Sequence, residues 1–192
     1  MLNMLNKSNC GLPLLQIKKK QIIKKLVLIL TVTLSLAFSK NSTAQETIVD
    51  VAVGNENFST LVTALKAADL VGALLGEGPF TVFAPTNEAF AKIDANTLNS
   101  LLEVKNQKAL ANILTYHVFA GKISAADVVA ALEKGAGMVE LKALNGQVLT
   151  VMQKDGKIWL KDSKGNYSEI VATDVNGSNG VIHVIDTVLM PE

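Results

Sequence analysis

Two histidines, His117 and His183, are the residues of this sequence best suited to bind a metal ion or to transfer a proton. A zinc site needs about three or four ligands of the His, Cys, Asp or Glu type, commonly at short regular spacings. Neither histidine has another histidine three or four residues away, and the only cysteine, Cys10, lies near the start of the chain. We therefore expect no metal and no cofactor. We interpret both histidines as structural side chains whose ring nitrogens bond to backbone groups.

Ser178 is a further candidate for chemistry because it lies in the Gly-rich run Asn176-Gly-Ser-Asn-Gly180. A nucleophilic serine in a Gly-x-Ser-x-Gly elbow must lead from a strand into a helix, whereas the β-branched residues after Gly180 predict a strand. The spacing Asp174-Val-Asn-Gly-Ser178 also resembles the start of a calcium loop. Its glycine falls one place late, however, and its twelfth position is Ile185 instead of glutamate. A plain turn explains the segment, so we expect no catalytic residue and no enzymatic activity.

The first 44 residues are typical of an export signal. Lysines at positions 18, 19, 20, 24 and 25 precede an apolar run over 26–38, and Ser42-Thr-Ala44 supplies the small residues that a signal peptidase recognises. The apolar run has 13 residues, whereas a membrane-spanning helix needs about 20. We predict cleavage after Ala44 and a secreted mature chain, residues 45–192, without a transmembrane anchor. Because Cys10 is removed with the signal, no disulfide is expected.

The predicted mature chain is acidic. The whole sequence has a net charge of +1, but residues 45–192 hold 11 lysines against 17 carboxylates, a net charge of −6, and no arginine occurs anywhere. Lys and Arg side chains neutralise phosphates in nucleic-acid complexes, so this composition argues against a nucleic-acid partner. At this length the mature chain has the size of one domain.

Helical patterns dominate the first half of the mature chain, and strand patterns dominate the second. Apolar residues recur at i, i+3, i+4 and i+7 from Phe58 and predict a helix over 58–74, with Asn57 as its N-cap. Further helices are predicted over 87–93, 97–102, 107–114 and from the capping box Ser124–Asp127 to Gly135, and strands over 80–84, 116–119, 147–153, 157–161, 169–173 and 181–189. Asp155-Gly156 predicts a hairpin turn, and Trp159 in that hairpin is expected to be at least partly buried. Helices followed by strands indicate an α+β fold.

Three segments of the chain, in this order and spacing, resemble the signature segments of the fasciclin (FAS1) family. They are Thr81-Val-Phe-Ala-Pro-Thr-Asn-Glu-Ala-Phe90, Leu114-Thr-Tyr-His-Val118 followed by Gly121-Lys122, and Asn179-Gly-Val-Ile-His-Val-Ile-Asp-Thr-Val-Leu189. The resemblance covers about residues 46–191. It implies a single domain in which two β-sheets form a wedge or sandwich, with short helices packed on one side. The structural signature residues are Phe83, Pro85, Thr86, Asn87, Phe90, Asn179, Gly180, His183 and Asp186.

Backbone chemistry predicts roles for some of these residues. Pro85 cannot donate to a β-ladder and should end its strand, and Asn87 can cap the turn that follows. Asn179-Gly180 suits an entry into the last strand through positive φ. That last strand is apolar on both faces, as expected of a central strand.

The resemblance also implies a function and a set of contact residues. Members of the family are typically secreted or surface-bound and mediate adhesion without catalysis, so the expected partner is an extracellular protein or polysaccharide surface. In animal relatives, integrin contact is attributed to a Tyr-His segment and to an Asp-Ile element before the last strand. The matching residues are Tyr116, His117, Glu169 and Ile170, with glutamate in place of aspartate and with extra turn residues at 174–178. Two alternatives stay open: a secreted carrier with a small-ligand pocket between helices and sheets and, less favoured, a hydrolase.

Overall fold

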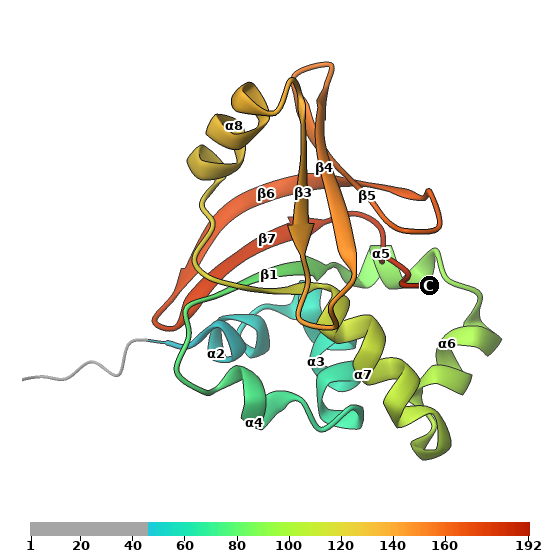
Figure 1. Ribbon diagram of the computed structural model, residues 1–192. Helices are drawn as coiled ribbons and strands as arrows, with labels where there is room; N and C mark the ends of the chain where they lie inside the picture. The colour runs from blue at the N-terminus through green and yellow to red at the C-terminus, as the bar shows by residue number, and fades with distance from the viewer. Residues whose placement is uncertain (1–45) are drawn as a thin grey trace, which may run out of the picture. The chain divides into compact units, whose positions relative to one another are not determined.

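The computed structural model describes residues 46–192 (Figure 1). The predicted export signal, residues 1–44 with its cleavage site after Ala44, lies outside the described residues. The helices are α2 (Ile48–Val53), α3 (Ser59–Ala67), α4 (Val71–Leu74), α5 (Asn87–Ala91), α6 (Ala95–Leu102), α7 (Gln107–Tyr116) and α8 (Ala125–Lys134), with the 3₁₀ turns η1 (Glu56–Phe58) and η2 (Val104–Asn106). The strands are β1 (Phe80–Pro85), β2 (Val118–Ala120), β3 (Met138–Lys142), β4 (Val148–Lys154), β5 (Lys157–Lys161), β6 (Tyr167–Gly177) and β7 (Gly180–Ile185). Over this part of the chain, every helix is too short or too polar to cross a membrane.

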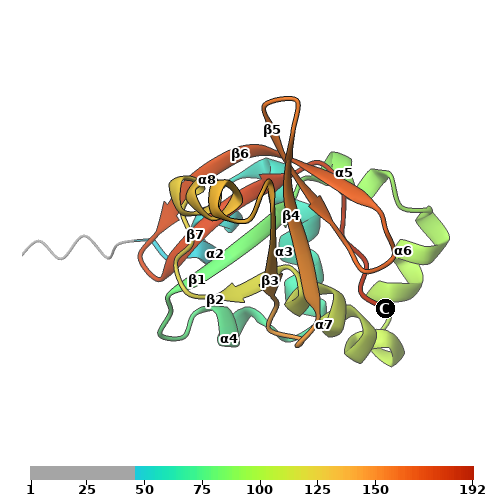
Figure 2. The same ribbon diagram turned by 45° about the horizontal axis from the view of Figure 1, so that its top comes forward.

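The seven strands form one mixed sheet in the order β2-β1-β7-β6-β5-β4-β3. β1 and β7 are parallel, and all other neighbouring strands are antiparallel. The sheet curls until it is nearly closed into a barrel, as Figures 1 and 2 show. A hydrogen bond from Leu144 N, just after β3, to Val118 O in β2 joins its two ends at 2.8 Å. The combination of these helices with a mostly antiparallel sheet confirms the α+β class.

The two separate sheets expected from the resemblance are replaced by this single sheet, and the cause lies in β6. The first residues of β6 pair with β5, as in Trp159↔Glu169, and the rest pair with β7, from Ile170↔Ile185 onward. Two register shifts, between Ile170 and Ala172 and between Ala172 and Val175, bend the strand. Bulges of this kind increase the local twist, so one long strand turns the corner between two halves that would otherwise be separate sheets.

Two hydrophobic cores lie on opposite faces of the central strands. Val82 and Ala84 of β1 and Ile182 and Val184 of β7 face the helices α2 to α5 and α7. The other core is enclosed by the curled sheet and contains the alternate residues Phe83 and Ile185, together with Val128 and Leu132 of α8. Helix α8 packs against β3 and β4 and lies across the sheet from the other helices (Figure 1), so the helices do not all cover one side. All of β7 is buried, as the sequence predicted for a central strand.

Two local signals read from the sequence are confirmed. At the start of α8, Ser124 Oγ accepts from Asp127 N at 3.2 Å, while Asp127 Oδ2 accepts from Ser124 N at 2.9 Å. Between β4 and β5, Asp155 and Gly156 take φ values of 54° and 75°, as a type I′ hairpin turn requires.

The helix predicted over 58–74 is divided into two helices. α3 ends at Ala67, Asp69 takes a positive φ of 57°, and α4 begins at Val71. A left-handed residue stops the helical hydrogen-bond ladder, and here it is an aspartate, so no glycine announces the break. The cap differs too, because Asn55, not Asn57, accepts from a backbone N–H at the start of η1.

Candidate functional site

The first and third signature segments lie side by side as β1 and β7. Their parallel register pairs Phe83 with His183 and Pro85 with Ile185. The Phe83 ring meets Phe119 of β2 edge-on, with ring centroids 5.3 Å apart, and lies 5.5 Å from the His183 ring. The signature thus builds the centre of the sheet.

Thr86 and Asn87, which are adjacent in sequence, cap two different helices. Thr86 Oγ1 accepts from Ala89 N at 3.2 Å and caps α5. The expectation that Asn87 caps this turn is wrong, because its Oδ1 accepts from Thr60 N in the first turn of α3 at 2.9 Å. Asn87 Nδ2 also donates to Glu56 O at 2.8 Å. Since α3 has no side-chain cap from its own N-terminus, Asn87 supplies one across the fold. Phe90, the last residue of this signature segment, is buried in the core.

Asn179 joins three segments that are distant in sequence. Its Oδ1 accepts from Ile48 N at the start of α2 at 3.0 Å, and its Nδ2 donates to Leu74 O at 2.8 Å and to Gly76 O at 3.2 Å. Gly180 next to it has no positive φ, so the expected role is wrong. Instead, a Cβ on Gly180 would overlap the carbonyl oxygen of Phe80 in β1. Gly180 is needed because the two backbones approach closely.

His117 is locked in the core in one neutral form. Its Nδ1–H donates to Ile113 O at 2.8 Å, and its Nε2 accepts from Leu189 N at 3.1 Å. An N–H group can bond only to an unprotonated nitrogen, so the proton lies on Nδ1. Burial lowers the pKa of His117 to about 4, against smaller opposite effects from the Ile113 carbonyl and from Asp162.

Both ring nitrogens of His183 also contact backbone groups. Its Nε2 lies 2.8 Å from Ile123 O, and its Nδ1 accepts from Asp174 N at 3.4 Å. Asp174 takes a positive φ of 58° in the bend of β6, and its Oδ1 accepts from Ala125 N at the start of α8 at 3.0 Å. His183 therefore helps to fix the bent strand and, through Asp174, the position of α8.

Tyr116 and His117 both lie in the interior of the fold. Tyr116 is 0% exposed and donates its hydroxyl proton to Val148 O at 3.0 Å, and His117 is 2% exposed. Burial also raises the pKa of the Tyr116 phenol. Ile170 is partly buried against the same core. Of the four residues matched to partner contact, only Glu169 is charged; its side chain is 21% exposed, and its carboxylate pairs with Lys157 at 2.7 Å.

The carboxylate of Asp186, the residue after β7, binds β6, Thr187 and Lys92. Its Oδ1 accepts from Glu169 N at 2.8 Å and from Thr187 Oγ1 at 3.1 Å, and its Oδ2 lies 3.0 Å from Lys92 Nζ. Partial burial alone would raise the pKa of this carboxyl. The hydrogen bonds from Lys92, Glu169 and Thr187 outweigh burial and leave the pKa lowered.

Replacing Asp186 by asparagine should lower the free energy of unfolding by about 1–3 kcal/mol at pH 7, because an amide has one acceptor oxygen and no charge. Lys92→Met, which removes only an exposed ion pair, should cost less than about 1 kcal/mol. The gap between the wild type and D186N should narrow as the pH falls through the lowered pKa, since the wild-type carboxylate then becomes protonated. Urea unfolding of the wild type and both variants at pH 7, and of the wild type and D186N at pH 3, checks these expectations; a gap between the wild type and D186N that stays constant would contradict the pH dependence.

The space between the helices and the sheet leaves little room for a ligand. A cavity of about 20 Å³ lies there, lined by α2, α3, α4, β1 and β7 residues such as Leu61 and Ile182. That volume is of the order of one water molecule. Ser178 lies in the β6–β7 turn and is followed by a strand. Across residues 46–192, no group of three or more His, Cys, Asp or Glu side chains could hold a metal ion.

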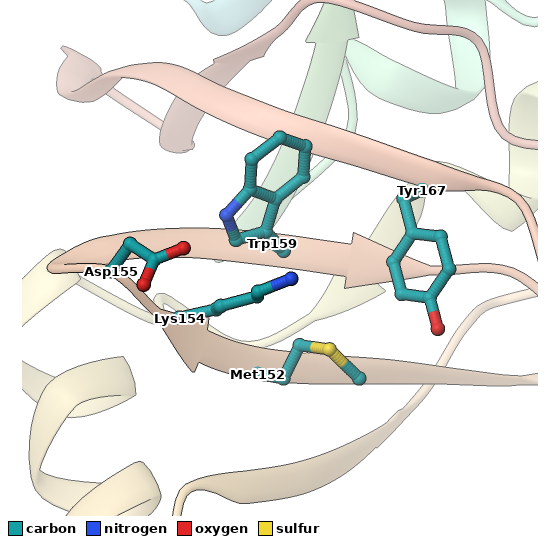
Figure 3. A pocket seen from close by; sticks show the side chains of 5 residues that line it. All are labelled: Met152, Lys154, Asp155, Trp159 and Tyr167. Atoms are coloured by element: carbon teal, nitrogen blue, oxygen red, sulfur yellow. The ribbon is translucent and has the colours of Figure 1, made fainter.

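An open concavity of about 430 Å³ lies on the outer face of the β4–β5 hairpin. It is lined by Met152, Lys154, Asp155, Trp159 and Tyr167, and Figure 3 shows the Trp159 indole among the other four side chains. The expectation that Trp159 is at least partly buried is confirmed, whereas the concavity around it was not predicted from the sequence. The alternation of side chains along β4 and β5 indicates that Met152 and Trp159 lie on the outer face, because Val151 and Leu160 face the core. Only the register between the strands brings the five residues together.

Comparison with known proteins agrees with this architecture. The Fasciclin domain family model matches residues 56–191. Protein sll1483 of Synechocystis sp. is 55% identical over 145 residues, which cover 76% of this chain and 73% of that protein. Cell surface glycolipoprotein MPB83 of Mycobacterium bovis is 35% identical over 153 residues, covering 77% of this chain and 62% of that protein.

A solved structure shares the fold. The FAS1 domain pair from the insect cell adhesion molecule fasciclin I aligns with a TM-score of 0.50 and 23% identity, over 68% of this chain and 45% of that one. The match of the family model to most of the chain and the 55% identity to protein sll1483 agree with the positions of the signature residues in the sheet. The chain therefore belongs to the fasciclin domain family.

Proposed function

We propose that the protein is an extracellular binding domain that contributes to adhesion or to the assembly of a surface layer and catalyses no reaction. One observation carries the proposal: the two histidines are buried, and both ring nitrogens of each contact backbone groups. Groups that often act as catalysts therefore serve the fold here. Family membership supports the proposal, as do a relative named as a cell surface protein and a structural neighbour from a cell adhesion molecule.

The proposal includes the form of the protein that reaches its partner. The chain is exported, the signal is cleaved after Ala44, and residues 45–192 act as one domain. The partner is a protein or polysaccharide at the cell exterior. Glu169 contacts it directly, and Ile170 borders the contact. Tyr116 and His117 act through the fold, by holding β2 and the C-terminal segment in place.

An attachment assay tests the proposal. Cells of the source organism are counted on surfaces coated with the purified protein and on surfaces coated with an unrelated acidic protein of similar size. Attachment should be several-fold higher on the former. Glu169→Ala should lower it, whereas Glu88→Ala, an exposed acidic residue on α5, should not.

Two results would count against the proposal. Attachment no higher than on the unrelated protein would contradict the adhesive function. Equal attachment by E169A, E88A and the wild type would contradict the role of Glu169 while leaving the adhesive function in place.

A further inference from the structure

The outer face of the sheet from β3 to β6 carries a continuous set of large side chains. The strand registers place Met138, Met152, Trp159 and Glu169 in one row and Glu140, Thr150, Lys161 and Tyr167 in the next. Side chains at alternate positions of a strand share a face. The intervening residues Val151 and Leu160 fill the enclosed core, so both rows point outward.

This face is hollowed around the one tryptophan of the sequence. The concavity of about 430 Å³ is within the range of small-ligand sites, about 300–1,000 Å³. Trp159 is half-buried, and Figure 3 shows its indole on the strand next to Met152, with Tyr167 further along the same face. Tyr167 is 50% exposed, and Met138 beside Met152 is 57% exposed. An open apolar and aromatic surface of this kind, bordered by charged residues, is typical of an interaction site.

The charge of this region is opposite to that of the rest of the domain. Residues 138–169 hold five lysines and four acids, a net charge of +1, whereas the other described residues hold six lysines and 13 acids, a net charge of −7. One of the four acids, Asp162, is buried and accepts from Asn166 and from Met190 N. The exposed charge of the hairpins is therefore more positive still, which favours a negatively charged partner.

We propose that the hairpin face, which we define as Met152, Lys154, Asp155, Trp159, Lys161 and Tyr167, binds an acidic polysaccharide through its uronic acid units. The C–H groups on one face of a sugar ring carry partial positive charge and pack against the negative face of an aromatic ring. In the bound state, a sugar ring stacks on Trp159. The ammonium groups of Lys154 and Lys161 pair with the ring carboxylates, and Asp155 accepts from sugar hydroxyls.

An acidic polysaccharide fits these features better than an acidic peptide. A run of carboxylate side chains uses the lysines but has no ring to pack against the indole, whereas a charged sugar ring does both. The inference rests on the proposed binding function and names the chemical class of the partner. Glu169, whose carboxylate is paired with Lys157 at 2.7 Å, then contacts the partner by accepting from sugar hydroxyls, as Asp155 does, and not by facing a ring carboxylate.

The experiment titrates the protein with a hexameric polyuronate, with a neutral hexasaccharide and with poly-glutamate. Because Trp159 is the only tryptophan, its fluorescence reports directly on the site. The polyuronate should change the emission, and binding should weaken as salt is raised. By calorimetry, Trp159→Ala should weaken binding by about ten-fold or more, as expected for a central aromatic contact.

Lysine variants test the charge without disturbing the sheet. Lys154→Gln and Lys161→Gln should each weaken binding by about three-fold or more and reduce its salt dependence. Lys105→Gln, on η2, is the matched control and should bind as the wild type does. Thermal unfolding of each variant confirms that the fold is retained.

Several results would overturn the inference. Equal binding of the neutral hexasaccharide would exclude charge recognition, and equal binding of poly-glutamate would exclude sugar recognition. Polyuronate binding that is unchanged in W159A, K154Q and K161Q would exclude this face, and no binding at millimolar polyuronate would exclude the ligand class. Cell attachment to the coated protein is measured independently, so attachment without polyuronate binding overturns this inference alone.

Discussion

Lowering the pH from 7 to 4 should remove about 3 kcal/mol from the free energy of unfolding through His117 alone. Its pKa is about 4 in the folded protein and about 6.5 in an unfolded chain. Between these values the unfolded state binds the additional proton, so stability falls as the pH falls. A protonated ring could also no longer accept the hydrogen bond from Leu189 N. The effect should be complete just below pH 4.

Urea unfolding followed by Trp159 fluorescence at pH 7, 6, 5 and 4 measures this loss. His117→Gln provides the comparison because glutamine does not titrate. It should be less stable than the wild type at pH 7 by about 1–3 kcal/mol, owing to imperfect hydrogen bonding in the core. Its stability should change much less down to pH 4, since the lowered pKa values of Asp50, Asp127 and Asp186 act near and below 3.8. Parallel pH profiles of the wild type and H117Q would contradict the assignment.

Gly180→Ala should destabilise the fold by about 3 kcal/mol or more. The added methyl group would overlap the Phe80 carbonyl oxygen, and the parallel β1–β7 pair at the centre of the sheet has packed cores on both faces. Neither strand can move aside without disturbing those cores, so overpacking at this point is costly. Urea and thermal unfolding measure the effect.

Gly72→Ala is the matched control. Gly72 lies in α4, where an added Cβ meets nothing within 4 Å, and alanine is the better helix former by about 0.5–1 kcal/mol. G72A should therefore be at least as stable as the wild type. If G180A were as stable as G72A, the close approach of β1 and β7 would not be a rigid feature of the fold.

The parts of the fold that could be predicted depend on neighbours in sequence. The capping box at Ser124 and Asp127 and the Asp155-Gly156 turn are formed by residues one to three positions apart, so their types alone indicate the geometry. The burial of β7 on both faces follows from its continuous apolar run.

The parts that could not be predicted depend on contacts across the fold. Asn87 caps α3, and the α3 residue that donates to it lies 27 positions earlier, so the sequence shows only an asparagine beside a nearer turn. Gly180 is fixed by β1 rather than by its own φ, and the bend of β6 depends on pairing with two different strands. The candidate site was missed for the same reason, because Trp159, Met152 and Tyr167 meet only through strand register.

The position of β7 in the sheet has a consequence for biosynthesis. The strand formed by Gly180–Ile185 is the last one in the described chain, yet it lies between β1 and β6. While the ribosome is still adding these residues, β1 and β6 each keep a bare backbone edge, and such edges invite pairing with other chains. The sheet can close only once nearly all of residues 46–192 have been synthesised, so the complete fold of this domain forms in a late step and not strand by strand from its N-terminal end.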